Sequence, residues 1–220
     1  MTNKVNIGKK ILSANEEYAQ KNRDFFKNNN KSCINIISSP GSGKTTILTR
    51  TITDIQDKIK IAVIEGDIQT DLDAQRIKAT NAPAIQVNTN GSCHLSAAQV
   101  TDAIEKLPAD ETELFIIENV GNLVCPSAFE LGESAKVVVL SVAEGDDKPA
   151  KYPEIFAKST AMLINKTDLL GAVDFDIERA SRDAAVINKD IKIFPVSAKT
   201  GEGMQAWYEW LVNLQLTIDD

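Results

Sequence analysis

A chain of 220 residues with 43% hydrophobic side chains is long enough for one α/β domain with a substantial buried core. Its 31 acidic and 24 basic residues give a formal net charge of −7, so the surface as a whole repels nucleic acid and anionic membranes. No apolar run approaches the roughly 18 to 20 residues of a membrane span, and the first ten residues lack a signal-peptide core. These features exclude nucleic-acid and membrane partners, and we expect a cytoplasmic protein that binds small molecules, metal ions or proteins.

Helices and strands are expected to alternate along the chain. Apolar residues at helical spacing predict a helix over residues 7–26, which a polar run at 27–31 ends. We therefore expect an N-terminal helical extension over 1–31 and one main domain over 32–220. Within that domain, apolar runs predict strands at 33–37, 61–65, 84–87, 114–118, 136–140, 161–164 and 191–194. Amphipathic segments predict helices at 44–56, 72–79, 96–106, 174–187 and 204–214.

The predicted strands are nearly continuous apolar runs that are separated by helices. Such strands are typical of a parallel sheet that is covered by helices on both faces. The predicted fold class is therefore α/β, with three layers and a mostly parallel central sheet that is flanked by helices, plus the N-terminal helix.

A phosphate-binding P-loop is predicted directly after the first strand. The segment SSPGSGKTT at residues 38–46 leads from that strand into a helix, which is the context a P-loop requires. Gly41 and Gly43 let backbone N–H groups face phosphate oxygens, Lys44 places a charge at the β- and γ-phosphates, and the Thr45 hydroxyl is a ligand for Mg²⁺. A Gly/Ser turn without function is the alternative, and the apolar strand before it disfavours that alternative. The predicted phosphate contacts are Pro40, Gly41, Ser42, Gly43, Lys44, Thr45 and Thr46.

The segment Asn-Lys-Thr-Asp predicts that the base is guanine. It follows a later strand, where ligands sit in open α/β sheets. The carboxylate of Asp168 accepts hydrogen bonds only, which suits the N1–H and NH₂ donors of guanine, and adenine has no such pair. The stem of Lys166 covers one face of the ring, and Asn165 braces neighbouring loops. After the next strand, backbone N–H groups around Ser197 and Ala198, next to Lys199, are expected to face the guanine O6. The order of these motifs favours GTP over ATP.

Acidic residues after two strands predict a Mg²⁺ site beside the P-loop. Glu118 begins Glu-Asn-Val-Gly and stands where GTPases with D-x-x-G have aspartate, so we expect it to hold the ion through a water. The Gly121 amide is then placed to sense the γ-phosphate. The predicted Mg²⁺ ligands are Thr45, Asp67 and Glu118.

A polar segment that contains Asp71 and Arg76 is a candidate switch, with a solvated helix face as the equal alternative. Asp67 and Asp73 are candidates to orient the attacking water, and the sequence leaves that choice open. The predicted catalytic set is Lys44, Asp67, Asp73 and Glu118.

Two cysteines and the single histidine predict a second metal site. Cys93 and His94 are adjacent in one loop, and Cys125 follows another strand, so the three can converge in space. Thiolate and imidazole ligands suit Zn²⁺ or Ni²⁺. A fourth ligand is open among water, the Cys93 backbone, a second protomer, Asp73 and Glu118. Packed cysteines without metal are the alternative, and Cys33, inside an apolar strand, is expected in the core.

These motifs resemble one protein family, the hydrogenase nickel-incorporation GTPases HypB. The resemblance rests on SPGSGKT, EGDIQTDLDAQRI, NTNGSCHL, ENVGNLVCP, AEGDDKP and NKTDL, which span nearly all of the chain. It implies a P-loop GTPase domain of the SIMIBI class over 32–220, with inserted metal-binding loops, that delivers nickel during maturation of [NiFe] hydrogenase. It also implies a GTP-promoted homodimer through the face with the metal loops, and as partners other maturation proteins and the hydrogenase large subunit. The implied Ni²⁺ or Zn²⁺ ligands are Cys93, His94 and Cys125, and the implied GTP contacts include Lys44, Thr45, Asn165 and Asp168.

Two features depart from the family pattern. Ser38 stands where G-x-x-x-x-G-K-[ST] has its first glycine. The first residues lack the cysteine cluster and histidine-rich run that some members use as an extra nickel site, so nickel storage is not expected. The related urease accessory GTPase has Cys-x-His, whereas Cys93 and His94 are adjacent here, which favours the hydrogenase branch.

The predicted function is a GTP-hydrolysing metallochaperone with slow intrinsic turnover, whose GTP state is coupled to metal binding and dimerisation. The alternatives are a regulatory or assembly GTPase with no metal role, a urease-type nickel accessory GTPase, and a P-loop kinase that prefers ATP. The choice between Ni²⁺ and Zn²⁺ stays open, because affinity order alone does not set selectivity.

Overall fold

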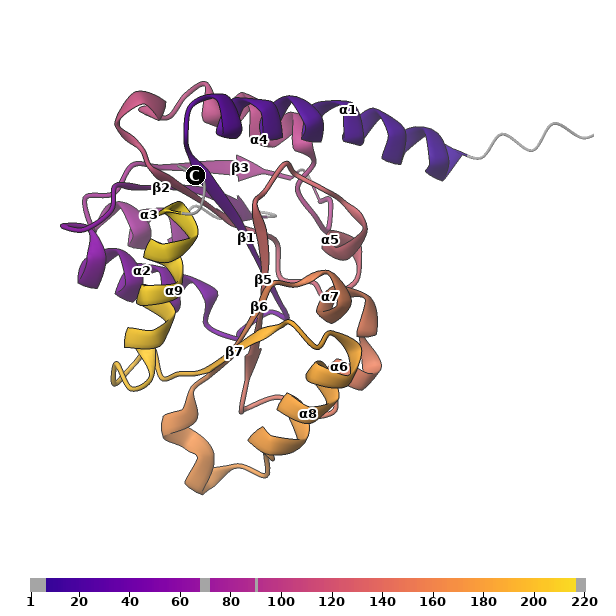
Figure 1. Ribbon diagram of the computed structural model, residues 1–220, viewed down its shortest axis with the longest axis vertical. Coiled ribbons are helices and arrows are strands. Elements are labelled where there is room, and N and C mark those ends of the chain that lie inside the picture. The colour runs from indigo at the N-terminus through magenta and orange to yellow at the C-terminus, as the bar shows by residue number, and fades with distance from the viewer. Residues whose placement is uncertain (1–6, 68–71, 90, 217–220) are drawn as a thin grey trace, which may run out of the picture.

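A seven-stranded parallel sheet forms the centre of the protein (Figure 1). The computed structural model describes residues 7–67, 72–89 and 91–216. The strand order is β3-β2-β4-β1-β5-β6-β7, and each neighbouring pair within the described residues is parallel. The predicted three-layer α/β fold is confirmed. The strands are β1 (Ser32–Ser38), β2 (Ile61–Asp67), β3 (Ala84–Asn88), β4 (Leu114–Glu118), β5 (Ala135–Ser141), β6 (Ala161–Asn165) and β7 (Lys192–Pro195).

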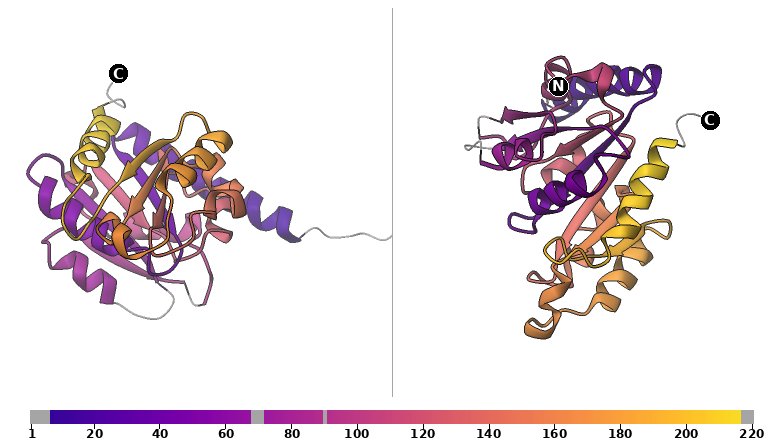
Figure 2. Two further views of the ribbon diagram at one scale, coloured as in Figure 1. Left: turned by 90° about the horizontal axis from the view of Figure 1, so that it is seen from below. Right: turned by 90° about the vertical axis from the view of Figure 1, so that its left-hand side faces the viewer.

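Helices cover both faces of this sheet. On one face, α9 lies beside α2, with α3 next to α2 (Figure 2). On the other face, α1 packs on α4 at one end, and α7 packs on α8 at the other. The helices are α1 (Ile7–Asn28), α2 (Lys44–Ile55), α3 (Leu72–Lys78), α4 (Ala97–Ile104), α5 (Cys125–Ala128), α6 (Lys148–Lys151), α7 (Pro153–Lys158), α8 (Ile177–Ile187) and α9 (Met204–Leu216), with 3-10 turns η1 (Ala109–Glu111) and η2 (Thr167–Ala172).

Strand β1 shows why its sequence is mostly apolar, with Ser32, Asn35 and Ser38 as its polar residues. All seven of its residues are buried, because alternate side chains enter two different cores. Ile34 and Ile36 pack with α2 and α9, whereas Cys33 packs with α1 and α4. Burial raises the pKa of the Cys33 thiol well above its usual value, so this cysteine stays protonated and belongs to the core, as predicted.

The N-terminal helix α1 belongs to the same core as the sheet. Ala19 and Phe26 are buried against β1, β2 and β4 side chains. Asn22 donates from Nδ2 to the carbonyls of Ala97 and Leu131, which ties α1 to the start of α4. The helix is therefore packed on the domain that follows it, while the predicted boundary at residue 31 stays a prediction.

Loops at the carboxyl ends of β1, β4 and β6 meet at one edge of the sheet. Strands β1 and β5 are neighbours, but the connection from β1 to β2 and that from β5 to β6 run toward opposite ends of the sheet, which makes a switch point between them. Ligands bind at such switch points in open α/β sheets. Among the described helices, none has the length and apolar character that crossing a membrane requires.

Candidate functional site

The P-loop wraps the N-terminus of α2 at this edge. Gly43 caps the helix with φ 96° and ψ 28°, a left-handed conformation that favours glycine. A Cβ at Gly43 would lie 2.5 Å from Nδ2 of Asn165, so a larger residue cannot fit without a shift. The helix N-terminus opens into a hollow of about 320 Å³ that fits phosphate groups. This hollow is lined by Gly41, Gly43, Lys44, Thr45, Thr46, Arg76, Glu118 and Lys166.

Ser38 has a structural part in the loop that the sequence did not indicate. Its hydroxyl accepts a hydrogen bond from Nζ of Lys44 at 3.0 Å and donates to the carbonyl of Ser39 at 2.7 Å. Both Ser38 and Lys44 are buried. The serine in place of the first glycine therefore provides a polar partner for the P-loop lysine.

A second hollow of about 200 Å³ adjoins the first and shares Gly43, Thr46 and Lys166 with it. Its floor is the Asn-Lys-Thr-Asp segment at the end of β6. Asn165 donates from Nδ2 to the Ser42 carbonyl at 2.9 Å, and its Oδ1 accepts from the Ala198 amide at 3.1 Å. Asn165 thus joins the P-loop to the loop after β7, which is the bracing position expected from the sequence.

Asp168 and Lys166 are held in positions that suit a purine. Asp168 accepts from the Ser197 hydroxyl at 2.6 Å, and Nζ of Lys199 lies 3.9 Å from its other oxygen. Lys166 has a left-handed φ of 64°, and its Nζ donates to the Gly41 carbonyl at 2.7 Å. The carboxylate is therefore oriented, and the lysine stem spans both hollows.

The two amides expected to face a base oxygen already have partners in the protein. The amide of Ser197 donates to the carbonyl of Glu202 at 2.9 Å, and that of Ala198 donates to Asn165. In this conformation a base oxygen can accept from either amide only by sharing its N–H group or by replacing its present hydrogen bond. The sequence could not reveal these two hydrogen bonds.

Hard oxygen ligands lie at the floor of the phosphate hollow. The Thr45 hydroxyl donates to Oε1 of Glu118 at 2.7 Å, and both residues are buried. Glu118 pairs in register with Glu65 on β2. A hydroxyl and a carboxylate in contact beside a phosphate hollow fit Mg²⁺. The side chains of Asp67 and Asp73, and the whole of Asp71, lie outside the described residues.

Gly121 and Arg76 flank the same hollow. A Cβ at Gly121 would come within 3.0 Å of Cα of Pro40, so its backbone lies directly against the P-loop. Arg76, from α3, donates from Nη2 to the Thr46 hydroxyl at 3.2 Å. The arginine therefore reaches the phosphate hollow although much of it is exposed.

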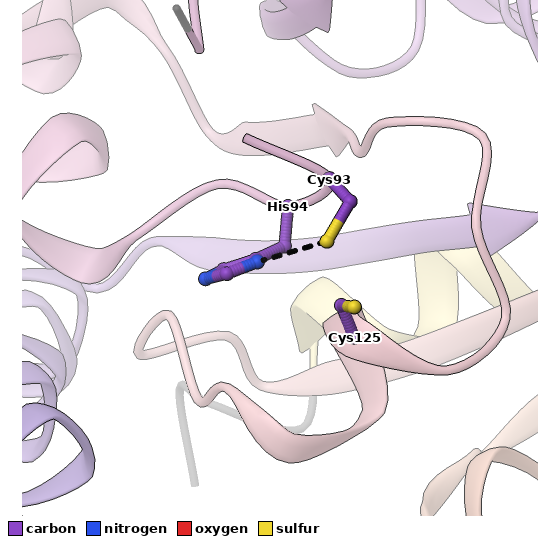
Figure 3. A group of neighbouring side chains, drawn as sticks. All are labelled: Cys93, His94 and Cys125. Carbon is purple, nitrogen blue, oxygen red and sulfur yellow. Dashed lines mark hydrogen bonds between the residues drawn. The ribbon is translucent and has the colours of Figure 1, made fainter. Parts of the chain in front are cut away.

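The structure brings Cys93, His94 and Cys125 together from two loops (Figure 3). One ligand atom from each lies within 4.8 Å of the others, and Sγ of Cys93 is 3.7 Å from Nδ1 of His94. Cys125 is the first residue of α5, and all three side chains are half-buried. Two thiols and an imidazole at this spacing can hold a soft divalent ion such as Zn²⁺ or Ni²⁺.

The described part of the chain offers no fourth side chain in this group, and Glu118 is outside it. Water, the Cys93 backbone and a second protomer therefore remain as the open alternatives, together with Asp73, whose side chain is not described.

Phe129 sets the orientation of the histidine. Its ring stacks on the imidazole of His94, with centroids 3.8 Å apart and planes at 27°. Phe129 follows α5 directly, so the helix that carries Cys125 also fixes the ring of His94. No sequence signal marked Phe129, because a lone aromatic residue after a short helix is not distinctive.

Metal binding at this group is expected to strengthen as the pH rises. A hydrogen bond that the Cys93 thiol donates to Cys125, together with burial, raises the pKa of Cys93, so an incoming ion must displace its proton. Affinity should then rise by about tenfold per pH unit for each displaced proton, until the pH passes that pKa. Burial lowers the pKa of His94, so its imidazole stays neutral and able to bind into more acidic solution.

Calorimetric titration of Zn²⁺ in two buffers of different ionisation enthalpy counts the released protons. A pH-independent affinity with no proton release would contradict the thiol ligands.

A larger hollow of about 400 Å³ lies elsewhere, between α1 and α4. It is lined by apolar and charged side chains such as Phe25, Ile104 and Glu105, and it contains none of the predicted site residues. This hollow is therefore separate from the candidate site at the carboxyl edge of the sheet.

Comparisons with known proteins agree with this geometry. Residues 32–195 match the family model described as CobW/HypB/UreG, nucleotide-binding domain. The chain is 51% identical over 201 residues to hydrogenase maturation factor HypB of Escherichia coli (strain K12), covering 91% of this chain and 69% of that protein.

Two solved structures superpose closely on this one. HypB from Archaeoglobus fulgidus is 38% identical, with a TM-score of 0.87, and 93% of this chain and 100% of that chain are covered. HypB from Helicobacter pylori in complex with nickel is 35% identical, with a TM-score of 0.88, and the coverage is 93% of this chain and 96% of that one.

Proposed function

The chain belongs to the HypB branch of the CobW/HypB/UreG family, and from this premise we propose that it is a GTP-hydrolysing metallochaperone for nickel. Its cargo is delivered during maturation of [NiFe] hydrogenase in the cytoplasm. The observation that carries the proposal is the single segment 118–125, which begins at Glu118, in contact with Thr45 of the P-loop, and ends at Cys125, in the Cys93–His94–Cys125 group. One short stretch of backbone therefore touches both the nucleotide and the cargo.

GTP binding uses the two adjoining hollows. The P-loop amides and Lys44 hold the phosphates, and Asp168 accepts from guanine. Thr45 and Glu118 hold Mg²⁺, which supplies charge stabilisation at the β- and γ-phosphates. Asp67 and Asp73 remain the candidates to orient the attacking water. GTPases that act mainly by positioning are slow until a partner supplies an activating group, so we expect slow turnover by the isolated chain.

The nickel ligands come from one protomer and leave coordination positions open. Cys93, His94 and Cys125 supply three donors, fewer than the four of a closed structural site. An incomplete set suits a cargo ion, which has to be taken up and released again. A second copy of the chain completes the site in the homodimer that GTP promotes. The recipients are other hydrogenase maturation proteins and the hydrogenase large subunit.

The rival functions make different demands on the same residues. A regulatory or assembly GTPase does not need Cys93 and Cys125 to lie beside an imidazole, and a urease accessory GTPase serves another enzyme. The stacking of Phe129 on His94, which holds a ligand ring in place, supports a metal role over mere packing.

Hydrogenase activity in a bacterial host that lacks its own HypB tests the proposal. Wild type is expected to restore the activity. Lys44→Ala removes the phosphate-binding cation and Cys125→Ala removes a nickel ligand, so both variants should leave hydrogenase activity near the background of the deletion strain. Full restoration by Cys125→Ala would favour the GTPase with no metal role. Restored urease without hydrogenase in the same cells would favour the urease type.

A further inference from the structure

A buried asparagine links two loops of the candidate site. One is the nucleotide loop, residues 119–121 beside the P-loop, and the other is the cargo loop, residues 91–95, which carries Cys93 and His94. Asn119 is 2% exposed and follows Glu118. Its Oδ1 accepts two backbone hydrogen bonds, one from the amide of Leu95 at 3.2 Å and one from the amide of Val120 at 2.9 Å. Leu95 directly follows the metal ligand His94, and Val120 directly precedes Gly121, whose backbone lies against the P-loop. One side-chain oxygen therefore joins the two loops.

A chain of buried polar groups fixes the orientation of the Asn119 side-chain amide. Asn119 donates from Nδ2 to Oδ1 of Asn35 at 3.2 Å, and Asn35 donates from its own Nδ2 to Glu133 at 3.0 Å. A carboxylate accepts hydrogen bonds only, so Asn35 must turn its nitrogen to Glu133 and its oxygen to Asn119. Asn119 then presents its nitrogen to Asn35 and its oxygen to the two loops. Lys136, 3.0 Å from Glu133, balances the buried charge.

Two further contacts hold the cargo loop, one to the segment after β4 and one to the end of β2. Asn122 donates from Nδ2 to the carbonyl of Cys93 at 3.4 Å and accepts from the amide of Val124 at 2.8 Å. The side chain of Leu95 is fully buried and lies against Gly66 at the end of β2, where an added Cβ would come within 2.8 Å of it. The Cys93–His94 pair is therefore flanked on both sides by hydrogen bonds with the segment that also carries Cys125.

We propose that Asn119 is the positioning residue that transmits the nucleotide state to the nickel ligands. The inference rests on the proposed coupling between GTP and nickel, and it assigns that coupling to one side chain. A backbone shift at Val120 and Gly121, on gain or loss of the γ-phosphate, moves the oxygen that also holds the amide of Leu95. Leaving the buried N–H group of Leu95 without its partner would cost free energy. The cargo loop therefore moves together with the Asn119 side chain.

The test compares nickel affinity with and without a non-hydrolysable GTP analogue and Mg²⁺ in wild type, Asn119→Ala and Asn22→Ala. Wild type should show a ratio of dissociation constants within the usual span of about 5- to 150-fold. Asn119→Ala should bring the ratio to about one while each ligand alone still binds. Asn22 is the matched control, because it is equally buried and also bridges two backbone groups, but it does not contact either loop of the site.

Asn119→Ser is a second variant for the case in which the alanine variant does not fold. Its oxygen stands one bond closer to the backbone, within reach of the neighbouring Val120 amide but short of Leu95, so the ratio should again fall to about one. A wild-type ratio that persists in Asn119→Ala or Asn119→Ser overturns the role of Asn119 and leaves the proposed function standing. A ratio of dissociation constants of about one in wild type overturns both the role of Asn119 and the proposed function.

Discussion

Replacing Asp168 by asparagine is expected to weaken GTP binding by about 10³-fold and to create binding of xanthosine triphosphate. The carboxylate of Asp168 is held by the Ser197 hydroxyl at 2.6 Å, so it is oriented before the base arrives. Loss of two charge-assisted bonds to guanine N1–H and NH₂ accounts for the drop, since each is worth about 1.5–3 kcal/mol. Xanthine carries a carbonyl where guanine has NH₂, and the new amide nitrogen can donate to it.

Titrations with GTP, ATP and xanthosine triphosphate measure this change. Asp190→Asn is the control, because it makes the same chemical change at an exposed position at the opposite edge of the sheet. A variant at Asp168 that retains wild-type affinity for GTP would place the base elsewhere. Preferential ATP binding by wild type would support the kinase alternative instead.

Replacing Cys125 by alanine should lower nickel affinity by at least about 100-fold, since changes that only support metal ligands already cost about 10- to 100-fold. Cys125 supplies one of two thiols in a group whose ligand atoms lie within 4.8 Å. Its loss leaves Cys93 and His94, two neighbours in one loop that offer only part of a coordination shell. Cys93→Ala should have an effect of similar size for the same reason.

Equilibrium dialysis with Ni²⁺ and with Zn²⁺ measures this loss, and Cys33→Ala serves as the matched control. Cys33 is a core thiol that packs with α1 and α4, away from the metal group, so its removal should leave nickel stoichiometry unchanged. Unchanged stoichiometry in Cys125→Ala would show that the cysteines are only packed.

The sheet and the nucleotide loops could be predicted because their signals are local. The run LFIIE matches β4 residue for residue, since a strand buried on both faces is apolar at nearly every position, and here the polar Glu118 stands only at its carboxyl end. The P-loop and the Asn-Lys-Thr-Asp segment carry residue types that a phosphate or a base demands. Each follows its strand directly, so the shared edge of a parallel sheet brings them together.

The remaining features depend on contacts between distant segments, which one sequence does not reveal. The helices α5, α6 and α7 have four to six residues each, too short for a periodic pattern. The bonds of Ser38 to Lys44, of Ala198 to Asn165 and of Asn119 to Leu95 are set by tertiary packing. Sequence motifs therefore marked the residues that we propose as ligands, while the polar groups that connect them emerged only from the fold.

Reciprocity provides the most direct test of the central claim that nucleotide and nickel act on one another. At equilibrium, if GTP changes nickel affinity by some factor, nickel must change GTP affinity by the same factor. The measurement is the dissociation constant of a non-hydrolysable GTP analogue with Mg²⁺, determined for wild type with Ni²⁺ bound and after its removal by a chelator. We expect two different dissociation constants, whose ratio equals the one found in the nickel titrations. Equal constants would show that nucleotide and nickel bind independently.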